Sequence, residues 1–371
     1  MQIKSFVSGL FGAVLLISCD QVRLPGADDL SLSQPETQPT PIEDADISPT
    51  PPPQKQTETQ QDRTETDNTG IETASVTDPV ILVSSLAEVN AALCGLPLQP
   101  QDPSLTLAQR TGAEPMSDDL VVVAAVNASA ASLRDFPGLV KMEPREFLPS
   151  GAIASGHCSA TRIAEHWFIT AAHCLDDDYD EVDLIVGVEN LRNPMARRIK
   201  AVSSVCHAAY GGAANSYFND IALVRISSDD VGTIADLPMA TFSDTDERLV
   251  PVNYGAARMA GWGLTDFRGS LSDVLLTASL TITGVGPGNI GVASVNGAGP
   301  CVGDSGGPLF IEEDDGRQSV VGVLSVVEQN MDTGAFCAGD YGARYTNLQG
   351  YADWISSVME ACDAGRGLCG Y

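Results

Sequence analysis

Residues 300–310 read "PCVGDSGGPLF", in which a cysteine, an aspartate and a serine lie among glycines and prolines before an apolar run. Clusters of this composition usually mark tight turns. Ser305 is therefore either an ordinary turn residue or an activated nucleophile. The segments upstream decide between these two interpretations.

Two upstream segments supply the partners that a nucleophilic serine needs. Residues 167–174, "WFITAAHC", end an apolar run at His173, and residues 219–226, "NDIALVRI", place Asp220 before an apolar strand. Alone, the histidine would be a packed or surface residue and the aspartate a turn or cap residue. Together the three residues predict a serine hydrolase, in which Ser305 attacks a carbonyl, His173 takes its proton and Asp220 fixes the histidine tautomer. Gly303 lets its own N–H and that of Ser305 face one oxyanion.

The apolar pattern from about residue 125 onward predicts an all-β fold. Short runs such as "VDLIVGV", "IALVRI" and "SVVGVLSVV" alternate with Gly, Asn and Asp turns, as in a barrel or a sandwich. Residues 350–362, "GYADWISSVMEAC", instead repeat their large apolar side chains at helical spacing, which predicts one amphipathic C-terminal helix.

These segments resemble the chymotrypsin/trypsin family of serine proteases from about residue 125 to residue 362. Further matches are "GWG" (261–263), "GVLSVV" (322–327), whose Ser325 would hydrogen-bond the catalytic Asp, and "RYTNLQGYADWI" (344–355). The resemblance implies two six-stranded antiparallel β-barrels with the site in the cleft between them. It also implies a serine endopeptidase acting on protein or peptide substrates. Two alternatives remain open, a protease-fold binding or scaffold protein without turnover and a non-protease esterase.

Eight cysteines remain besides Cys19, and an even number in an exported chain favours disulfides over metal ligands. The resemblance implies the pairs Cys158–Cys174 and Cys301–Cys337. The other four cysteines allow three pairings, of which we expect Cys206–Cys362 and Cys94–Cys369. No metal and no cofactor are expected.

The substrate pocket that the resemblance implies lacks a charge. Its floor position, six residues before Ser305, is Gly299, which Pro300 follows. One wall is Val327, two residues after Ser325, and the facing wall is Ala343. Without a carboxylate at the floor, cleavage after Arg or Lys is not expected, and a preference for small apolar residues is.

The family resemblance also assigns Asp304 to activation, because a freed terminal ammonium pairs with this carboxylate in the family. The matching start, Ala125-Val126-Asn127-Ala128, lacks the usual motif, and no Arg or Lys precedes it until Arg110. We therefore expect an elastase-like cut between Ala124 and Ala125, or a single-chain enzyme that orders Asp304 in another way.

The N-terminal residues predict export and a membrane tether. Residues 1–18 resemble a bacterial lipoprotein signal, with Cys19 as the lipidated residue; the alternative is a plain secretory signal and a secreted protein. Residues 19–79, rich in Pro, Thr and Glu, predict a disordered linker. Residues 80–124, with a short helix over 81–93, predict a pro-segment or extension before the protease domain at 125–371.

The predicted location is the periplasmic side of the bacterial cell envelope, at the inner or the outer membrane. The formal net charge of −29 would repel nucleic acid, so no nucleic-acid partner is expected.

Overall fold

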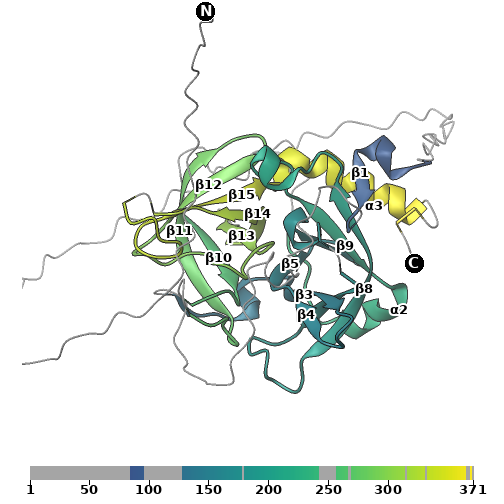
Figure 1. Ribbon diagram of the computed structural model, residues 1–371, viewed down its shortest axis with the longest axis horizontal. Coiled ribbons are helices and arrows are strands. Elements are labelled where there is room, and N and C mark those ends of the chain that lie inside the picture. The colour runs from purple at the N-terminus through teal and green to yellow at the C-terminus, as the bar shows by residue number, and fades with distance from the viewer. Residues whose placement is uncertain are drawn as a thin grey trace, which may run out of the picture. The chain divides into compact units, whose positions relative to one another are not determined.

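Antiparallel strands form two closed barrels in the computed structural model of this chain (Figure 1). The structure describes residues 84–95, 128–177, 179–241, 256–265, 269–313, 316–330, 332–364 and 368–369. The chain divides into the units Met1–Ala74 and Ser75–Tyr371, and every described residue belongs to the second. The predicted signal, Cys19, the linker and the expected cut before Ala125 lie outside the described residues. Among the described residues, no helix is both long enough and apolar enough to span a membrane.

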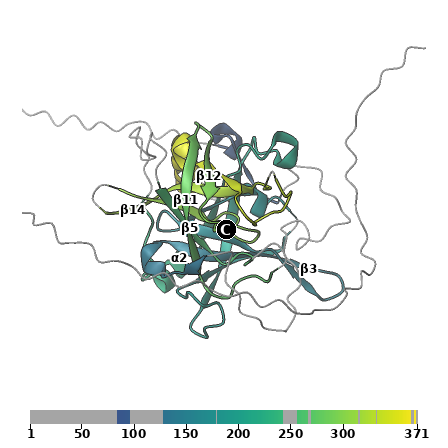
Figure 2. The same ribbon diagram turned by 90° about the vertical axis from the view of Figure 1, so that its left-hand side faces the viewer.

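The first barrel closes through the strand order β8-β7-β3-β5-β6-β9, because β9 also pairs with β8. Two short strands are added outside this ring, β1 beside β8 and β4 beside β3. The end of β3 that pairs with β4 extends from the barrel as a hairpin (Figure 2). The strands are β1 (Ala91–Leu93), β3 (Leu139–Phe147), β4 (Ile153–Ser155), β5 (Cys158–Arg162), β6 (Trp167–Thr170), β7 (Glu181–Val186), β8 (Arg197–His207) and β9 (Ala222–Ile226).

The second barrel closes through the order β10-β13-β14-β15-β12-β11, with a further pairing of β10 to β11. A short strand, β2, lies on the outer edge of β11. The strands are β2 (Ser129–Ala130), β10 (Ala256–Gly261), β11 (Leu276–Val285), β12 (Asn289–Ser294), β13 (Pro308–Glu312), β14 (Gln318–Val327) and β15 (Gly342–Asn347). The expected two six-stranded barrels are thus confirmed.

Side-chain alternation explains why these segments become barrel strands. In β11, Leu276, Ala278, Leu280 and Ile282 are buried, whereas the residues between them are partly or fully exposed. This period of two gives a strand with one face in the core and one in solvent. By contrast, β6 and β9 are buried along their whole length. The barrels also contact each other, and the rings of Phe136 and Phe310 meet edge-to-face at 5.7 Å between centroids.

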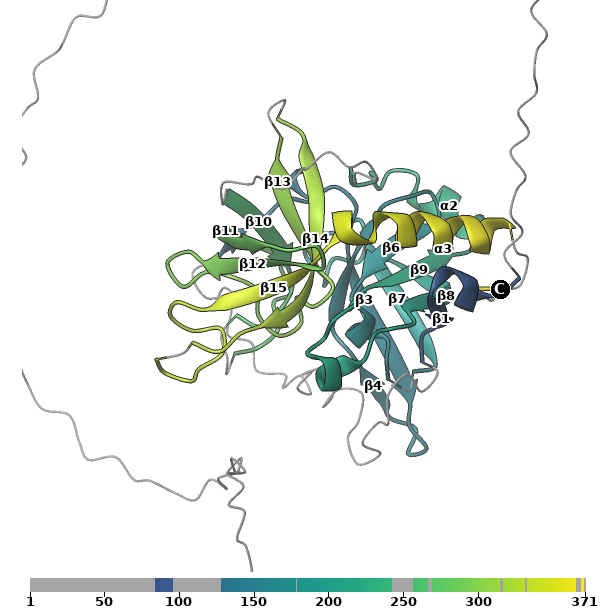
Figure 3. The same cartoon turned by 90° about the horizontal axis from the view of Figure 1, so that it is seen from above.

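The C-terminal helix α3 (Ala352–Ala364) lies along the first barrel beside β6 and β9 (Figure 3). Its buried side chains include Trp354, Ile355, Val358 and Cys362, which confirms the helical periodicity expected from the sequence. The remaining helical elements are short: η1 (Leu86–Val89), η2 (Leu133–Asp135), η3 (Ala172–Cys174), η4 (Gly212–Asn215), α2 (Ser228–Val231), η5 (Gly232–Ile234) and η6 (Leu348–Tyr351).

The segment before the protease domain differs from its prediction, because it contributes a strand to the first barrel. The described part has one 3-10 turn, η1, which ends at Asn90 in the left-handed region with φ 53°. The chain then continues as β1, in register with β8 so that Ala92 faces Cys206. The expected helix over 81–93 therefore does not extend through residues 91–93, which instead pair with β8.

Two disulfides differ from the expected pairing. Cys94 follows β1 directly and bonds Cys206 of β8, since the β1–β8 register brings their Cα atoms to 5.1 Å. Cys362, near the end of α3, bonds Cys369. The predicted pairs Cys206–Cys362 and Cys94–Cys369 are therefore wrong. Cys158–Cys174 and Cys301–Cys337 are the other two disulfides, as the family resemblance implied.

Candidate active site

His173 and Asp220 meet because the strands next to them pair. Thr170, at the end of β6, lies opposite Ala222 at the start of β9, so the residues just beyond these ends are neighbours. His173 Nδ1 lies 2.8 Å from Asp220 Oδ2, and the His173 backbone N–H donates to Asp220 Oδ1 at 2.9 Å. An ionised carboxylate only accepts hydrogen bonds, so Nδ1 carries the proton and Nε2 has a free lone pair.

The Asp220 carboxylate is completely buried and is held from both barrels. Ser325 Oγ, from β14 of the second barrel, donates to Asp220 Oδ2 at 2.6 Å. Thr346 Oγ1, from β15, donates to the Asp220 backbone carbonyl at 2.7 Å. These contacts fix the orientation of the carboxylate, and through it the orientation of the imidazole ring.

Opposing influences act on the pKa of His173. Burial lowers this pKa, whereas the charge and hydrogen bond of Asp220 and the charge of Asp176 raise it; the net shift is upward. Asp176 accepts a hydrogen bond from Tyr210 Oη at 2.9 Å, and burial raises its own pKa to about 6. Asp176 is three residues after His173, and the sequence analysis did not single it out.

Ser305 is docked against the first barrel close to the end of β6. Its carbonyl accepts a hydrogen bond from the Ser159 N–H at 2.8 Å. The next residue, Gly306, has φ 73°, and a Cβ there would lie 2.1 Å from Thr170 Oγ1. Only glycine allows this approach, which brings the serine turn to the chain that leads into His173. Among the described residues no hydrogen bond joins Ser305 Oγ to His173 Nε2, and such bonds often tighten only when substrate binds.

The Gly303 peptide is oriented by its neighbours. Its φ of 92° is accessible mainly to glycine, and a Cβ would lie 2.6 Å from Leu271 Cδ2. The Val302 carbonyl accepts from the Leu264 N–H at 2.7 Å. Because C=O and N–H point in opposite directions across a trans peptide, the Gly303 N–H is turned away from Leu264. No backbone hydrogen bond within the described part of the chain uses this N–H, so it can donate to a substrate oxygen.

Asp304 points away from Ser305 into a buried site in the second barrel. Its carboxylate accepts from the Gly263 N–H at 2.7 Å and from the Cys301 N–H at 2.9 Å. Burial raises its pKa to about 6, against the effect of these two hydrogen bonds and of the Lys141 charge. Two backbone donors therefore hold this carboxylate in the described structure.

The residues predicted for the substrate pocket lie on neighbouring segments. Val327 on β14 and Ala343 on β15 are directly opposite in the strand pairing, so the two walls adjoin. Tyr341, which the sequence analysis missed, is buried beside the predicted floor. Its hydroxyl donates to the Pro300 carbonyl at 3.0 Å, and a Cβ on Gly299 would lie 2.8 Å from the Tyr341 hydroxyl oxygen. The only sequence signal was its position two residues before Ala343.

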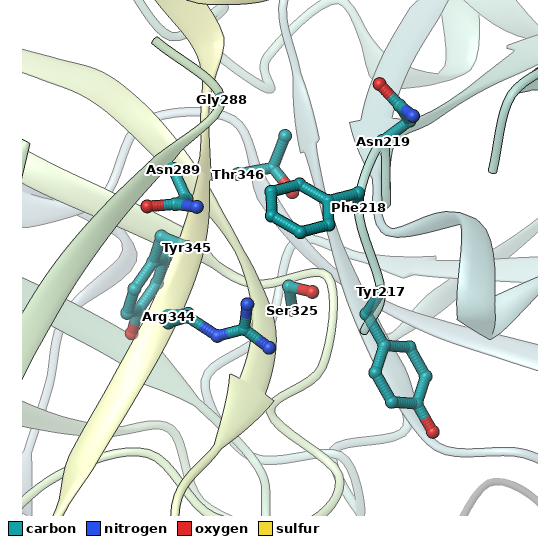
Figure 4. Close-up of a pocket in the computed structure, with 9 residues that line it drawn as sticks. All are labelled: Tyr217, Phe218, Asn219, Gly288, Asn289, Ser325, Arg344, Tyr345 and Thr346. Carbon is teal, nitrogen blue, oxygen red and sulfur yellow. The ribbon is translucent and has the colours of Figure 1, made fainter. Parts of the chain in front are cut away.

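A surface hollow, open to solvent, is lined in part by Ser325 (Figure 4). The Phe218 ring and the Arg344 guanidinium both point into it. Arg344 Nη2 also donates to the Ser216 carbonyl at 3.1 Å, which joins the two barrels at this point. The hollow is lined by Tyr217, Phe218, Asn219, Gly288, Asn289, Ser325, Arg344, Tyr345 and Thr346.

The segment before Asp220 is strained in a way that the sequence did not reveal. Ser216, Tyr217 and Asn219 all adopt positive φ near 58°, although none is glycine. Such residues cost roughly 1–3 kcal/mol each and persist where the surroundings hold them in place. The Tyr217 ring lies edge-on to His173 at 6.2 Å between centroids, so the strain places an aromatic wall beside the imidazole.

In the part of the chain that the structure describes, one group of potential metal ligands includes His173, together with Cys158 and Cys174. The two sulfur atoms are joined in a disulfide and His173 is bonded to Asp220. This group is therefore committed to covalent and hydrogen bonds within the chain.

Comparisons with known proteins agree on one family. The trypsin family profile matches residues 136–355. Brachyurin from Leptuca pugilator is 30% identical over 213 residues, which are 54% of this chain and 86% of brachyurin. Fibrinolytic enzyme, isozyme C, from Lumbricus rubellus is 28% identical over 226 residues, 54% of this chain and 88% of that protein. Serine protease Hayan from Drosophila melanogaster is 27% identical over 234 residues, 56% of this chain but only 35% of Hayan.

Proposed function

Because this chain belongs to the trypsin family and is accordingly a serine endopeptidase, we propose that Ser305, His173 and Asp220 form its catalytic triad. The observation that carries this proposal is the buried Asp220 carboxylate, which bonds His173 Nδ1 at 2.8 Å and Ser325 at 2.6 Å. Because Asp220 bonds Nδ1 of His173, the Nε2 atom of the same ring is the base that faces the serine turn. The substrates of the family are proteins and peptides.

The proposed reaction begins when Ser305 Oγ attacks the scissile carbonyl carbon while its proton passes to His173 Nε2. Asp220 stabilises the imidazolium that forms. The N–H groups of Gly303 and Ser305 donate to the oxyanion of the tetrahedral intermediate. His173 then gives the proton to the leaving amine, and water hydrolyses the acyl-enzyme by the same steps.

Substitution of the proposed nucleophile tests this assignment. We expect Ser305→Ala to lose peptide hydrolysis by at least about 10³-fold in kcat, because the attacking oxygen is removed. Ser129→Ala, at an exposed position on β2, is the matched control and should keep full activity. Equal activity in the two variants would refute the assignment.

We further propose that the enzyme prefers small apolar residues before the scissile bond. The pocket formed by Gly299, Pro300, Val327 and Ala343 carries no charged side chain, and the Tyr341 ring closes its floor. Ser325 lies on β14, two residues before Val327. A long basic side chain would find neither depth nor a counter-charge there.

A peptide library varied at the residue before the cut tests this preference. Ala, Val and similar residues should lead, and Val327→Gly should raise the relative rate for larger apolar residues by roughly 10-fold, since each methylene is worth about 1–3 kcal/mol. A clear preference of the unmodified enzyme for Arg or Lys would contradict the proposal.

We also propose that a lipid on Cys19 tethers the protease domain, through residues 20–79, to the periplasmic side of a bacterial envelope membrane. The support is the sequence alone: a short apolar run that ends at Cys19 and a Pro-rich, acidic linker after it. Incorporation of labelled palmitate in a bacterial host, lost in Cys19→Ala, is the expected result. Unlabelled protein released to the medium would instead indicate plain secretion.

A further inference from the structure

Lys141, on β3, is the one buried lysine among the described residues, with 1% of its surface exposed. The whole sequence has four lysines, and Lys200, the other one that the structure describes, is at the surface. Burying an ammonium group is costly unless it finds partners. A buried lysine at a barrel interface therefore needs a structural or functional reason.

The Lys141 side chain crosses from the first barrel to the serine turn of the second. Its Nζ donates to the Gly303 carbonyl oxygen at 3.3 Å. Among the described residues this is the only hydrogen bond that the ammonium group makes. Gly303 is the residue whose N–H would bind the oxyanion. Lys141 thus contacts the peptide immediately after that N–H.

Gly303 is consequently held on both sides. The Val302 carbonyl before it bonds the Leu264 N–H, and its own carbonyl bonds Lys141. Since a glycine rotates easily about φ and ψ, both flanking peptides must be fixed if its N–H is to keep one direction. The backbone of the second barrel fixes one peptide, and Lys141 fixes the other.

Burial and the neighbouring charges act in opposite directions on the ammonium group of Lys141. Burial lowers its pKa to about 8, while the carboxylates of Glu143 and Asp304 act in the opposite direction. His157, on the segment before β5, stays neutral because burial and the Lys141 charge lower its pKa to about 3. The described residues contain no direct ion pair between Lys141 and Asp304, so the carbonyl of Gly303 is the group that the ammonium touches.

We propose that Lys141 is a positioning residue for the oxyanion hole, whose ammonium holds the Gly303 carbonyl and so orders the turn from Gly303 to Ser305. The ammonium that contacts this turn then comes from β3 of the first barrel. This inference rests on the proposed function, because it assigns a role in the same reaction. Lys141 does not touch the reacting atoms; it acts through Gly303.

The test compares Lys141→Met and Lys141→Gln with the unmodified full chain, with Lys200→Met as the surface control. The rate of covalent labelling of Ser305 by a fluorophosphonate, and kcat and KM for a peptide ester, are measured from pH ~6 to pH ~10. Lys141→Met should lower kcat on the order of 10- to 100-fold with little change in KM, because the oxyanion donors matter mainly in the transition state. Lys141→Gln keeps a neutral hydrogen-bond donor, so its kcat should lie between those of the unmodified enzyme and Lys141→Met.

The pH profile separates positioning from a purely structural role. The unmodified enzyme should lose activity as the pH rises through about 8, where the ammonium loses its proton, and Lys141→Met should lack this alkaline limb. Thermal unfolding of Lys141→Met should occur at or above the normal temperature, since an apolar side chain replaces a buried charge. The alkaline loss of activity is a property of the unmodified enzyme, so it tests the inference even when a variant does not fold.

Each outcome decides the matter. Lys141→Met with unchanged kcat, or with the alkaline limb still present, would overturn the inference while the triad stands. A wild-type profile that stays flat above pH 8 would do the same. A wild-type protein that the fluorophosphonate does not label at Ser305 would remove the proposed function, and this inference with it.

Discussion

Asp220 is the residue on which the geometry of the site converges. Replacing it with Asn leaves the shape intact but offers His173 Nδ1 an amide that can present either oxygen or N–H, so the productive tautomer is no longer enforced. We expect Asp220→Asn to reduce kcat on the order of 10⁴-fold. Steady-state kinetics measure this, with Asp236→Asn, at an exposed ion pair with Arg197, as the control. A loss below about tenfold would show that Asp220 does not orient the base.

The pKa of His173 predicts where activity fails in acid. The neutral imidazole is the active base, and its pKa lies above the ordinary value of 6.5, so kcat/KM should fall with an apparent pKa above 6.5 as the pH is lowered. Asp176→Asn removes a negative charge that favours the imidazolium. The acid limb should therefore move to lower pH while the plateau is kept. A limb that stays in place, or moves to higher pH, would contradict this role of Asp176.

At the scale of elements, strand pairing assembles the site. β6 and β9 bring His173 to Asp220, and β14 and β15 supply Ser325 and Thr346 from the other barrel. Cys158–Cys174 holds the start of β5 to the end of η3, beside His173. The site is therefore a product of closing and joining both barrels.

The sequence predicted the elements better than their distant connections. The all-β pattern and the terminal helix follow from periodicity, the expected meeting of His173 and Asp220 follows from local motifs, and the two barrels follow from the family resemblance. The pairing of Cys94 does not, because it depends on whether a short segment joins the edge of β8, which is a long-range event. Tyr341 and the positive φ values before Asp220 were missed for the same reason: contacts with other strands decide them.

The two disulfides that the sequence analysis did not predict should differ in their effect on stability. Cys94–Cys206 spans 112 residues, whereas Cys362–Cys369 spans 7. The loop-entropy argument gives about 4–5 kcal/mol for the first and about 2–3 for the second. Replacing both cysteines of a pair with Ser should therefore lower the free energy of unfolding more for Cys94–Cys206 than for Cys362–Cys369, as measured by denaturant titration. The reverse order would show that β1 contributes little to the fold.

At the scale of the whole molecule, the Cys94–Cys206 bond bears on the proposed activation. A cut between Ala124 and Ala125 would separate the N-terminal segment from the protease domain in the chain, but the disulfide would still join them. Cut protein should thus run as one species without reductant and as two with it, and the larger fragment should begin at Ala125. Two separate species without reductant would contradict this arrangement.

The acidity of the chain also acts at this scale. A formal charge of −29 repels nucleic acids and anionic surfaces, so a lipid rather than basic side chains would have to provide any attachment to a membrane. Basic or neutral protein segments would approach the site more readily than acidic ones. This bias would act beside the proposed preference for small apolar residues before the scissile bond.

The central claim is that Ser305 is a nucleophile activated by His173. The most direct measurement is peptide mapping by mass spectrometry after reaction with a fluorophosphonate, in which the serine oxygen bonds phosphorus and fluoride leaves. The account predicts a single adduct on Ser305 that is lost in Ser305→Ala and strongly slowed in His173→Ala. No adduct on the active protein, or an adduct on another residue at the same rate in all three forms, would contradict it.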